Sequence, residues 1–223
     1  MTRGLKLAFL VVFFSCLTGG ILQSRVEEVI DVTSDPLQEQ VIATPMIFHL
    51  NDYKWVVTPR AHYRIAARVL THAVYNSGWQ SLISPMDLAL GWGTFADRRA
   101  DQWVEWSQSG RWYFYHWTPN APFDSKQIGE HSANVHIIPA NEEVKSALQY
   151  VRNNDAVLLE GELVDVDGSR GDRVYGWRTS LSREDTGDGA CEILYLQRII
   201  VNGIEYHQDK TVETITTTAA MKK

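Results

Sequence analysis

The sequence predicts a mainly β (α+β) protein, in which one small, strongly curved β-barrel follows an N-terminal membrane helix. Three observations lead to this prediction. Short aromatic and β-branched runs alternate with turn residues along most of the chain. A single amphipathic helix, at about 141–153, lies between strand-like segments. The longest strand-like segment contains Gly161, and a glycine within a strand often marks a bulge or a barrel corner.

Residues 1–23 are predicted to be a signal anchor or a signal peptide. Arg3 and Lys6 precede a charge-free run from Leu7 to Leu22, which as a helix would reach about 24 Å against a hydrocarbon core of about 30 Å. An uncleaved anchor, a cleaved secretory signal and a lipoprotein signal with lipid on Cys16 are the alternatives, together with a buried core helix. The first three place the leading charges in the cytoplasm. They also place the domain outside the cytoplasm, in the periplasm if the cell has two membranes. The favoured location is the cell membrane, with the chain crossing it once.

The rest of the chain divides into three parts by composition. Residues 24–44 are polar and predict a stalk, residues 45–209 a single β-rich globular domain, and the Thr-rich residues 210–223 a disordered tail. Cys191 is the only cysteine after the apolar run. No disulfide can therefore form within the domain, and its stability must come from its core.

The first half of the domain begins with a predicted hairpin. Two aromatic and β-branched runs, 46–50 and 53–59, are joined by Asn51 and Asp52, which favour a tight turn. Alternation over 62–75 predicts one long strand, and the aromatic run at 110–117 is the strongest strand signal in the chain.

Residues between these strands predict a helical or loop insertion at about 84–106. Ser84 could cap a helix that starts at Pro85 and stops at Gly91. Trp103 and Trp106, three residues apart, also suit one face of a helix. Such an insertion is larger than a barrel needs and could cover one end of it.

The second half of the domain begins with the predicted amphipathic helix at about 141–153. Asn141 is its expected N-cap, with Glu142 and Glu143 in its first turn. The helix leads directly into a strand that runs from 155 to a hairpin tip at Asp167–Gly168. Further strands are predicted at 173–181 and 191–207, the last with Asn202–Gly203 as a tight turn.

The pattern "V..AL..V..NDAVLLEGELVDV" resembles the helix-to-strand passage of oligonucleotide/oligosaccharide-binding (OB) barrels. The resemblance covers about a quarter of the chain and is one of patterning. It implies an OB-like barrel, with a two-sheet sandwich or an irregular α+β domain as the alternatives.

Aromatic residues provide the candidate binding face. Eight tryptophans and nine tyrosines are more than a core of this size needs, and large aromatic side chains are common in binding surfaces. Trp92, Trp112 and Trp117 could form a partner groove, and Arg183 is a further candidate binding residue. The formal net charge of −6 argues against nucleic acid as the main partner.

Candidate catalytic residues occur in two segments, 129–141 and 179–192. His131 and His136, with a nearby acid, could bind Zn²⁺. Cys191 could act as a nucleophile with one of these histidines as its base, and Asp185 or Glu192 could orient that histidine. Two alternative interpretations of the second segment are a calcium loop formed by Asp185, Asp188 and Glu192 and an aspartic-protease "DTG" at 185–187. The simplest reading is a polar connection whose acids cap backbone groups or pair with Arg183.

The sequence favours a membrane-tethered extracytoplasmic binding or assembly module that contacts a protein, a peptide or an envelope glycan. It contains neither a G-x-G-x-x-G fingerprint nor a Walker loop, and no cofactor is predicted. The alternative is a metal- or cysteine-dependent hydrolase with a site formed by His131, His136, Asp185, Cys191 and Glu192. A structural subunit of an envelope complex, in a homo- or hetero-oligomer, is a third hypothesis.

Overall fold

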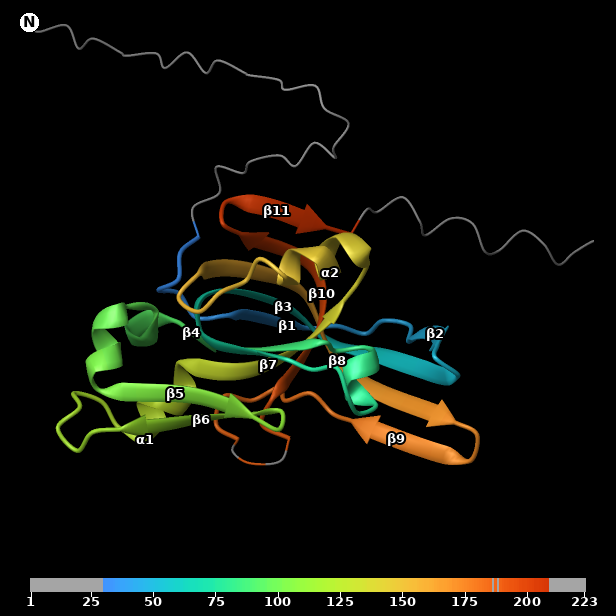
Figure 1. Ribbon diagram of the computed structural model, residues 1–223, viewed down its shortest axis with the longest axis horizontal. Coiled ribbons are helices and arrows are strands. Elements are labelled where there is room, and N and C mark those ends of the chain that lie inside the picture. The colour runs from blue at the N-terminus through green and yellow to red at the C-terminus, as the bar shows by residue number, and fades with distance from the viewer. Residues whose placement is uncertain (1–29, 186, 188, 209–223) are drawn as a thin grey trace, which may run out of the picture.

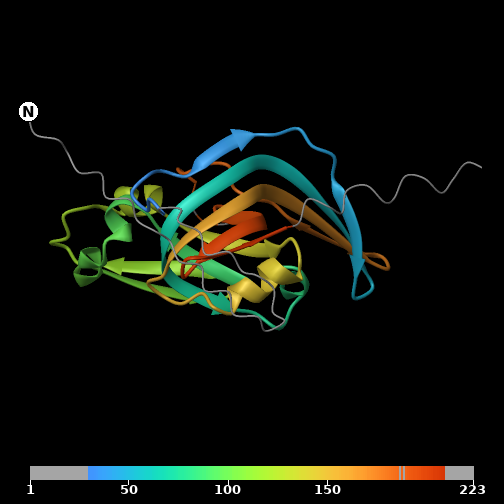
Figure 2. The same ribbon diagram turned by 90° about the horizontal axis from the view of Figure 1, so that it is seen from above.

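The computed structural model describes residues 30–185, 187 and 189–208. The expected membrane helix at 1–23 and the expected tail at 210–223 lie outside these residues. Among the residues described, no helix is both long enough and apolar enough to span a bilayer. The described part is mainly β, as predicted, and its largest sheet is strongly curled (Figures 1 and 2).

Five strands pair with one another in a closed cycle. They are β3 (Tyr53–Val74), β4 (Met86–Gly91), β7 (Ser132–Pro139), β10 (Glu192–Val201) and β8 (Ala156–Arg170). Each strand pairs with the next in this order, and β8 returns to β3. The β7–β10 pair is parallel and the other four are antiparallel.

The main core lies inside this cycle of strands. Side chains alternate between the two faces of a strand, so Leu88 and Leu90 of β4, Val135 and Ile137 of β7, and Leu194 of β10 all face inward and are fully buried. A second apolar cluster lies outside the first and includes Trp55 and Val57 of β3, Val164 and Val166 of β8, and Ile193 of β10. Ile138 of β7 and Ile193 of β10, which alternate with residues of the inner core, therefore face this second cluster.

A bulge in β3 explains why β3 and β8 contribute side chains to both apolar clusters. The register of β3 against β8 shifts between Pro59 and Ala61, and a one-residue shift turns the side chains that follow to the opposite face. Ala61 therefore joins the inner core, whereas Val57 joins the outer cluster.

The predicted helix is α2 (Glu142–Leu148), which connects β7 to β8. Asn141 caps it as expected, because its side chain accepts a hydrogen bond from Val144 N at 2.8 Å. The helix ends at Leu148, earlier than predicted. The chain then continues through the fully buried Val151 into β8, where a Cβ on Gly161 would lie 2.1 Å from Tyr195 O. The register of β10 shifts close by, between Leu196 and Arg198.

Two predicted tight turns are confirmed. β2 (Met46–Leu50) pairs with the start of β3 across Asn51–Asp52, whose φ angles are 51° and 62°. β11 (Ile204–His207) pairs with β10 across Asn202–Gly203. Asparagine, aspartate and glycine tolerate positive φ better than other residues, so local chemistry fixes both turns.

Two expectations for the connections are wrong. Residues 86–91 form the central strand β4, not a helix, and every one of its residues is buried. The hairpin tip lies at 170–173, with Gly171 at φ 57°, because Asp167 and Gly168 remain within β8 and pair with β9 (Arg173–Trp177). Residues after β4 form the short 3-10 helices η2 (Gly93–Ala96) and η3 (Arg98–Gln102).

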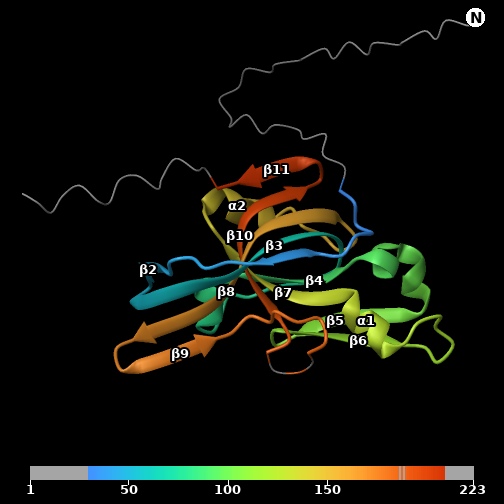
Figure 3. The same cartoon turned by 180° about the vertical axis from the view of Figure 1, so that it is seen from behind.

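A hairpin of β5 (Val104–Ser109) and β6 (Trp112–Trp117) covers part of the outer face of the cycle. Figures 1 and 3 show it on the side of the molecule opposite to the ends of β2 and β9. Gln108 Nε2 donates to Asn134 Oδ1 at 2.8 Å, and Tyr113 Oη lies 3.2 Å from Ser132 Oγ. Gly110 and Arg111 form the turn with positive φ, so the predicted strand at 110–117 starts at Trp112.

Three short elements complete the fold. β1 (Leu37–Gln40) pairs with β3, so part of the segment expected to be a stalk belongs to the sheet. η1 (Gln80–Leu82) connects β3 to β4. α1 (Ser125–Glu130), which the sequence reading missed, precedes β7 and has a capping box formed by Asp124 and Gln127.

Candidate functional site

An open cleft of about 700 Å³, called the outer cleft below, borders β7 at His136. Four separate parts of the chain line it: β7, the β3–β4 connection, the β5–β6 turn and the segment from β9 to β10. Its lining includes the side chains of Tyr75, Arg111, Trp112, His136 and Trp177. A concave site at which distant segments converge is a common position for ligand binding.

A buried ionic cluster lies under this cleft. Asp87 of β4 pairs directly with His136 of β7 in the sheet register, and neither side chain is more than 3% exposed. Arg111 Nη1 lies 2.7 Å from Asp87 Oδ1, and His136 Nδ1 lies 2.9 Å from the same oxygen, although that second contact lacks hydrogen-bond geometry. Asp87 Oδ2 has no hydrogen-bond partner in the described part of the chain. A buried carboxylate is tolerated only when it is paired, so Arg111 is the main support of Asp87.

Arg111 is held in place by aromatic side chains as well as by charge. Its guanidinium carbon lies 3.9 Å from the ring centroid of Tyr75 and 5.7 Å from that of Trp177, both within the usual cation–π range. The ring of Trp177 also lies 4.5 Å from that of His136. Arg111 has a φ of 74°, and a non-glycine residue with positive φ is more common at sites where geometry is constrained by function.

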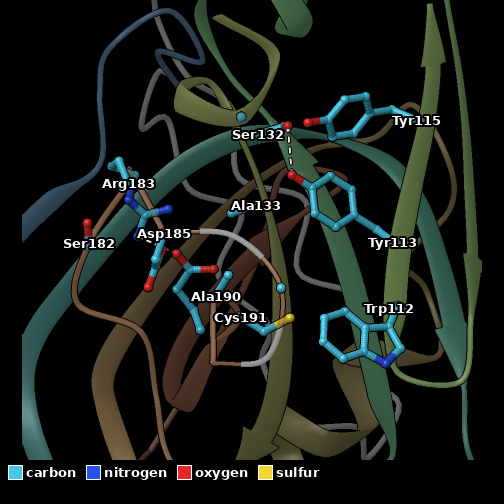
Figure 4. Close-up of a pocket in the computed structure, with 13 residues that line it drawn as sticks. Trp112, Tyr113, Tyr115, Ser132, Ala133, Ser182, Arg183, Asp185, Ala190 and Cys191 are labelled. Carbon is cyan, nitrogen blue, oxygen red and sulfur yellow. Dashed lines mark hydrogen bonds and ion pairs between the residues drawn. The ribbon is translucent and has the colours of Figure 1, made fainter. Parts of the chain in front are cut away.

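A second, smaller hollow of about 200 Å³ lies beside the outer cleft and is called the inner cavity below (Figure 4). Trp112 and Cys191 line both. The inner cavity adds Tyr113 and Tyr115 from β6 and Ser132 from β7. Arg183 and Asp185 of the connection before β10, and Glu192 at the start of β10, complete its charged lining. In Figure 4, Trp112, Tyr113 and Tyr115 extend from one strand towards Ser132 and Cys191.

The inner cavity contains a buried ion pair. Arg183 Nη2 contacts Glu192 Oε1, and the Glu192 side chain is 1% exposed. Burial raises the pKa of Glu192 to about 7, although the charge of Arg183 opposes this shift. The guanidinium of Arg183 also lies 5.8 Å from the ring centroids of Tyr63 and Trp92. These contacts attach the β9–β10 connection to one end of the inner core.

The surroundings of Cys191 favour the neutral thiol over the thiolate. Burial raises the pKa of its thiol to about 11, a shift opposed by a hydrogen bond from Asn134 and reinforced by the charge of Glu192. The Asn134 amide nitrogen lies 3.6 Å from the sulfur. A catalytic cysteine needs a cation or imidazolium that lowers the thiol pKa, and the shift here has the opposite sign.

The five residues of the hydrolase hypothesis do not gather around one point. Asp185, Cys191 and Glu192 line the inner cavity. Cys191 also lines the outer cleft together with His136, but Asp185 and Glu192 do not. His131 caps α1, with Nδ1 3.0 Å from Gln127 O, and borders a third hollow that contains neither Cys191 nor His136.

The metal hypotheses can be compared with the structure only in part. Across residues 30–185, 187 and 189–208, no three His, Cys, Asp or Glu side chains cluster as metal ligands would. Asp188 of the calcium hypothesis lies outside the described residues. Asp185 accepts a hydrogen bond from Ser180 Oγ at 2.6 Å, and Glu192 pairs with Arg183, as the simplest reading of this polar connection expects.

The four candidate binding residues lie in different surroundings. Trp92 is fully buried, and its Nε1 donates to Asp35 Oδ1 at 3.0 Å. Trp112 and Trp117 lie on β6 and are 36% and 37% exposed, but only Trp112 lines the cleft and the cavity. Arg183 lines the inner cavity.

Sequence reasoning missed Asp87, Arg111 and Trp177. An acid inside the apolar run "MDLALG" was the available signal for Asp87, because a charge in a buried strand normally has a partner. No comparable signal marked Arg111 or Trp177, which reach the site from separate hairpins.

Comparison of the chain with protein-family models, with curated proteins and with solved structures gives no match in any of the three. The basis for a function is therefore the chemistry of the cleft and the cavity themselves.

Proposed function

We propose that the chain is a membrane-tethered extracytoplasmic binding module that holds an envelope glycan in the outer cleft. The observation that carries this proposal is the grouping of Tyr75, Trp112 and Trp177 around the Asp87–Arg111 ion pair and the His136 ring beside it. Sugar rings have apolar faces that stack on aromatic side chains, and their hydroxyl groups need fixed polar partners.

The strand order supports this choice of cleft. We propose that the closed cycle is an OB-like barrel, because α2 leads into the fourth strand and the third strand runs parallel to the fifth. OB barrels bind oligonucleotides and oligosaccharides on the face of their second and third strands, and through the loops 1–2 and 4–5. In the proposed correspondence these are β4, β7, the β3–β4 connection and the β8–β10 connection, all of which border the outer cleft or its ionic floor.

Charge favours a glycan over nucleic acid as the ligand. Arg111 and Arg178, the two arginines that line the cleft, are already paired with Asp87 and Asp167. The formal net charge of −6 also disfavours a phosphate backbone as the ligand. Membrane tethering rests on the apolar run at 7–22 and on its leading positive charges.

Two tryptophans of β6 provide a matched test. The full-length chain is titrated with neutral, amino-sugar and uronic-acid oligosaccharides, and then as its Trp112→Ala and Trp117→Ala variants. Trp112 lines the cleft and Trp117 does not, while their exposures are nearly equal. We expect Trp112→Ala to weaken binding by about 10-fold or more, since loss of an aromatic anchor commonly costs over 1 kcal/mol.

Trp117→Ala is expected to stay within about twofold of the wild type. Equal losses in the two variants would show that the cleft is not the binding site. Binding of peptides with no affinity for any oligosaccharide would reject the glycan as the ligand.

A further inference from the structure

The inner cavity has an excess of negative charge that the proposed glycan site does not use. Among the described residues, its wall contains the carboxyl groups of Asp185 and Glu192 and the guanidinium of Arg183. Glu192 Oε1 is occupied by Arg183, whereas Glu192 Oε2 has no hydrogen-bond partner among the described residues. The side chain is 1% exposed, so an unpaired carboxylate oxygen is buried beside an open space.

A buried oxygen of this kind is costly unless a donor reaches it. Leaving a buried polar atom unsatisfied costs roughly 1–3 kcal/mol, and more when the group is charged. Because the carboxylates outnumber the guanidinium in this wall, a ligand with one positive charge would balance the cavity.

Aromatic side chains form the opposite wall. Trp112, Tyr113 and Tyr115 line the cavity together with the hydroxyl of Ser132. Electron-rich ring faces attract alkylammonium groups, and such rings combined with carboxylates are a common way to recognise them. A guanidinium pairs best with both oxygens of one carboxylate, whereas Glu192 has only Oε2 without a partner.

We propose that the inner cavity binds the terminal ammonium group of a small organic amine, with Glu192 Oε2 as its main acceptor and the three β6 rings around its alkyl carbons. The volume of about 200 Å³ compares with the roughly 150 Å³ of an engineered cavity that holds benzene. A short alkylamine, or the end of a lysine-like side chain, therefore fits. This site is additional to the glycan cleft, with which it shares Trp112 and Cys191.

The site predicts a pH dependence with a definite sign. Burial raises the pKa of Glu192 to about 7, and only the ionised carboxylate pairs with an ammonium group. The ionised fraction rises roughly 10-fold between pH 6 and pH 8, so the affinity should rise by a similar factor, with release of a proton on binding. Among the described residues, Glu192 interacts electrostatically with five other titratable or charged groups: Tyr63, Tyr113, Arg183, Asp185 and Cys191.

Calorimetric titration of the full-length chain with butylammonium chloride tests the proposal. Butan-1-ol controls for the alkyl chain, and potassium chloride at equal ionic strength controls for charge alone. We expect butylammonium to bind, with an affinity that rises about 10-fold from pH 6 to pH 8, and neither control to bind. Equal binding of butan-1-ol, no binding of butylammonium or an affinity independent of pH would each overturn the proposal.

Charge-neutral variants locate the site. Glu192→Gln should weaken butylammonium binding about 10- to 100-fold, and Glu105→Gln, an exposed residue of β5 with the same change of charge, should leave it unchanged. Equal effects of the two variants would overturn the assignment. If Glu192→Gln fails to fold, butylammonium binding to Asp185→Asn and the pH profile of binding to the wild type decide whether the assignment holds. Loss of oligosaccharide binding in Trp112→Ala would report on the glycan proposal, whereas Glu192→Gln reports on the amine.

Discussion

Arg111→Gly is the most informative perturbation of the ionic cluster beneath the outer cleft. Glycine accepts the φ of 74° at this turn, so the backbone strain of about 1–2 kcal/mol is relieved. Glycine also gives the unfolded chain more freedom, at a cost of about 0.5–1 kcal/mol. These two backbone effects nearly cancel, and the lost side chain decides the result.

The side chain supports a carboxylate that water cannot reach. Asp87 is fully buried and Arg111 is 14% exposed, with 2.7 Å between the paired atoms. Breaking a buried pair by removing one partner costs about 3–5 kcal/mol. We therefore expect Arg111→Gly to lower the free energy of unfolding by about 3 kcal/mol, which at a slope of about 2 kcal/mol per M shifts the urea midpoint by about 1.5 M.

Urea unfolding of the full-length chain measures this effect, with two further variants. Asn202→Gly changes another positive-φ turn residue, whose side chain is exposed, and should stay within about 0.5 kcal/mol of the wild type. Adding Asp87→Asn to Arg111→Gly removes the unpaired charge and should restore at least about 1 kcal/mol. An Arg111→Gly variant as stable as the wild type, or a double variant with no recovery, would refute the reasoning.

Two further predictions concern Gly161 and Cys191. Gly161→Ala should lower the free energy of unfolding by about 3 kcal/mol or more, because its Cβ would lie 2.1 Å from Tyr195 O. Gly129→Ala is the control: a Cβ at this helical position meets nothing within 4 Å, so the free energy of unfolding should rise by about 0.5–1 kcal/mol. Equal effects of the two variants in a melting experiment would contradict the close β8–β10 contact. In a Cys16→Ser background, iodoacetamide should modify Cys191 about 10- to 100-fold more slowly at pH 8 than it modifies the urea-unfolded chain. Burial raises the thiol pKa to about 11, so an inflection of the rate below pH 9 would show that the thiol is activated.

Local chemistry explains which parts of the fold could be predicted from the sequence. Asn51–Asp52 and Asn202–Gly203 determine their turns through their own tolerance of positive φ. Asn141 caps α2 through a bond to a residue three positions on. Each of these features depends on neighbours in the chain, and each was predicted correctly.

The wrong prediction at 84–91 has an equally clear cause. Ser84 and Pro85 can begin a helix and Gly91 can end one. The run between them is buried on both faces. Leu88 and Leu90 lie in the inner core, and Arg111 covers Asp87 on the other face. Periodicity cannot separate a doubly buried strand from a buried helix, since neither shows a polar face.

The candidate sites, like the fold, include a part that the sequence could predict and a part that it could not. Asp185, Cys191 and Glu192 could be grouped because they are close in sequence, and all three line the inner cavity. Asp87, Arg111 and His136 come together only through the β4–β7 register and the position of the β5–β6 turn. That long-range pairing depends on the whole cycle of strands, so the sequence alone did not reveal it.

The most direct test of the glycan proposal is to follow the tryptophan indole N–H signals by NMR while an oligosaccharide is added to the full-length chain. The account predicts that the signals of Trp112 and Trp177, which line the outer cleft, shift together and saturate. Signals of Trp55 and Trp92, both fully buried, should stay in place, as should that of Trp117. Saturating shifts at Trp117 or Trp92 with none at Trp177 would contradict the account.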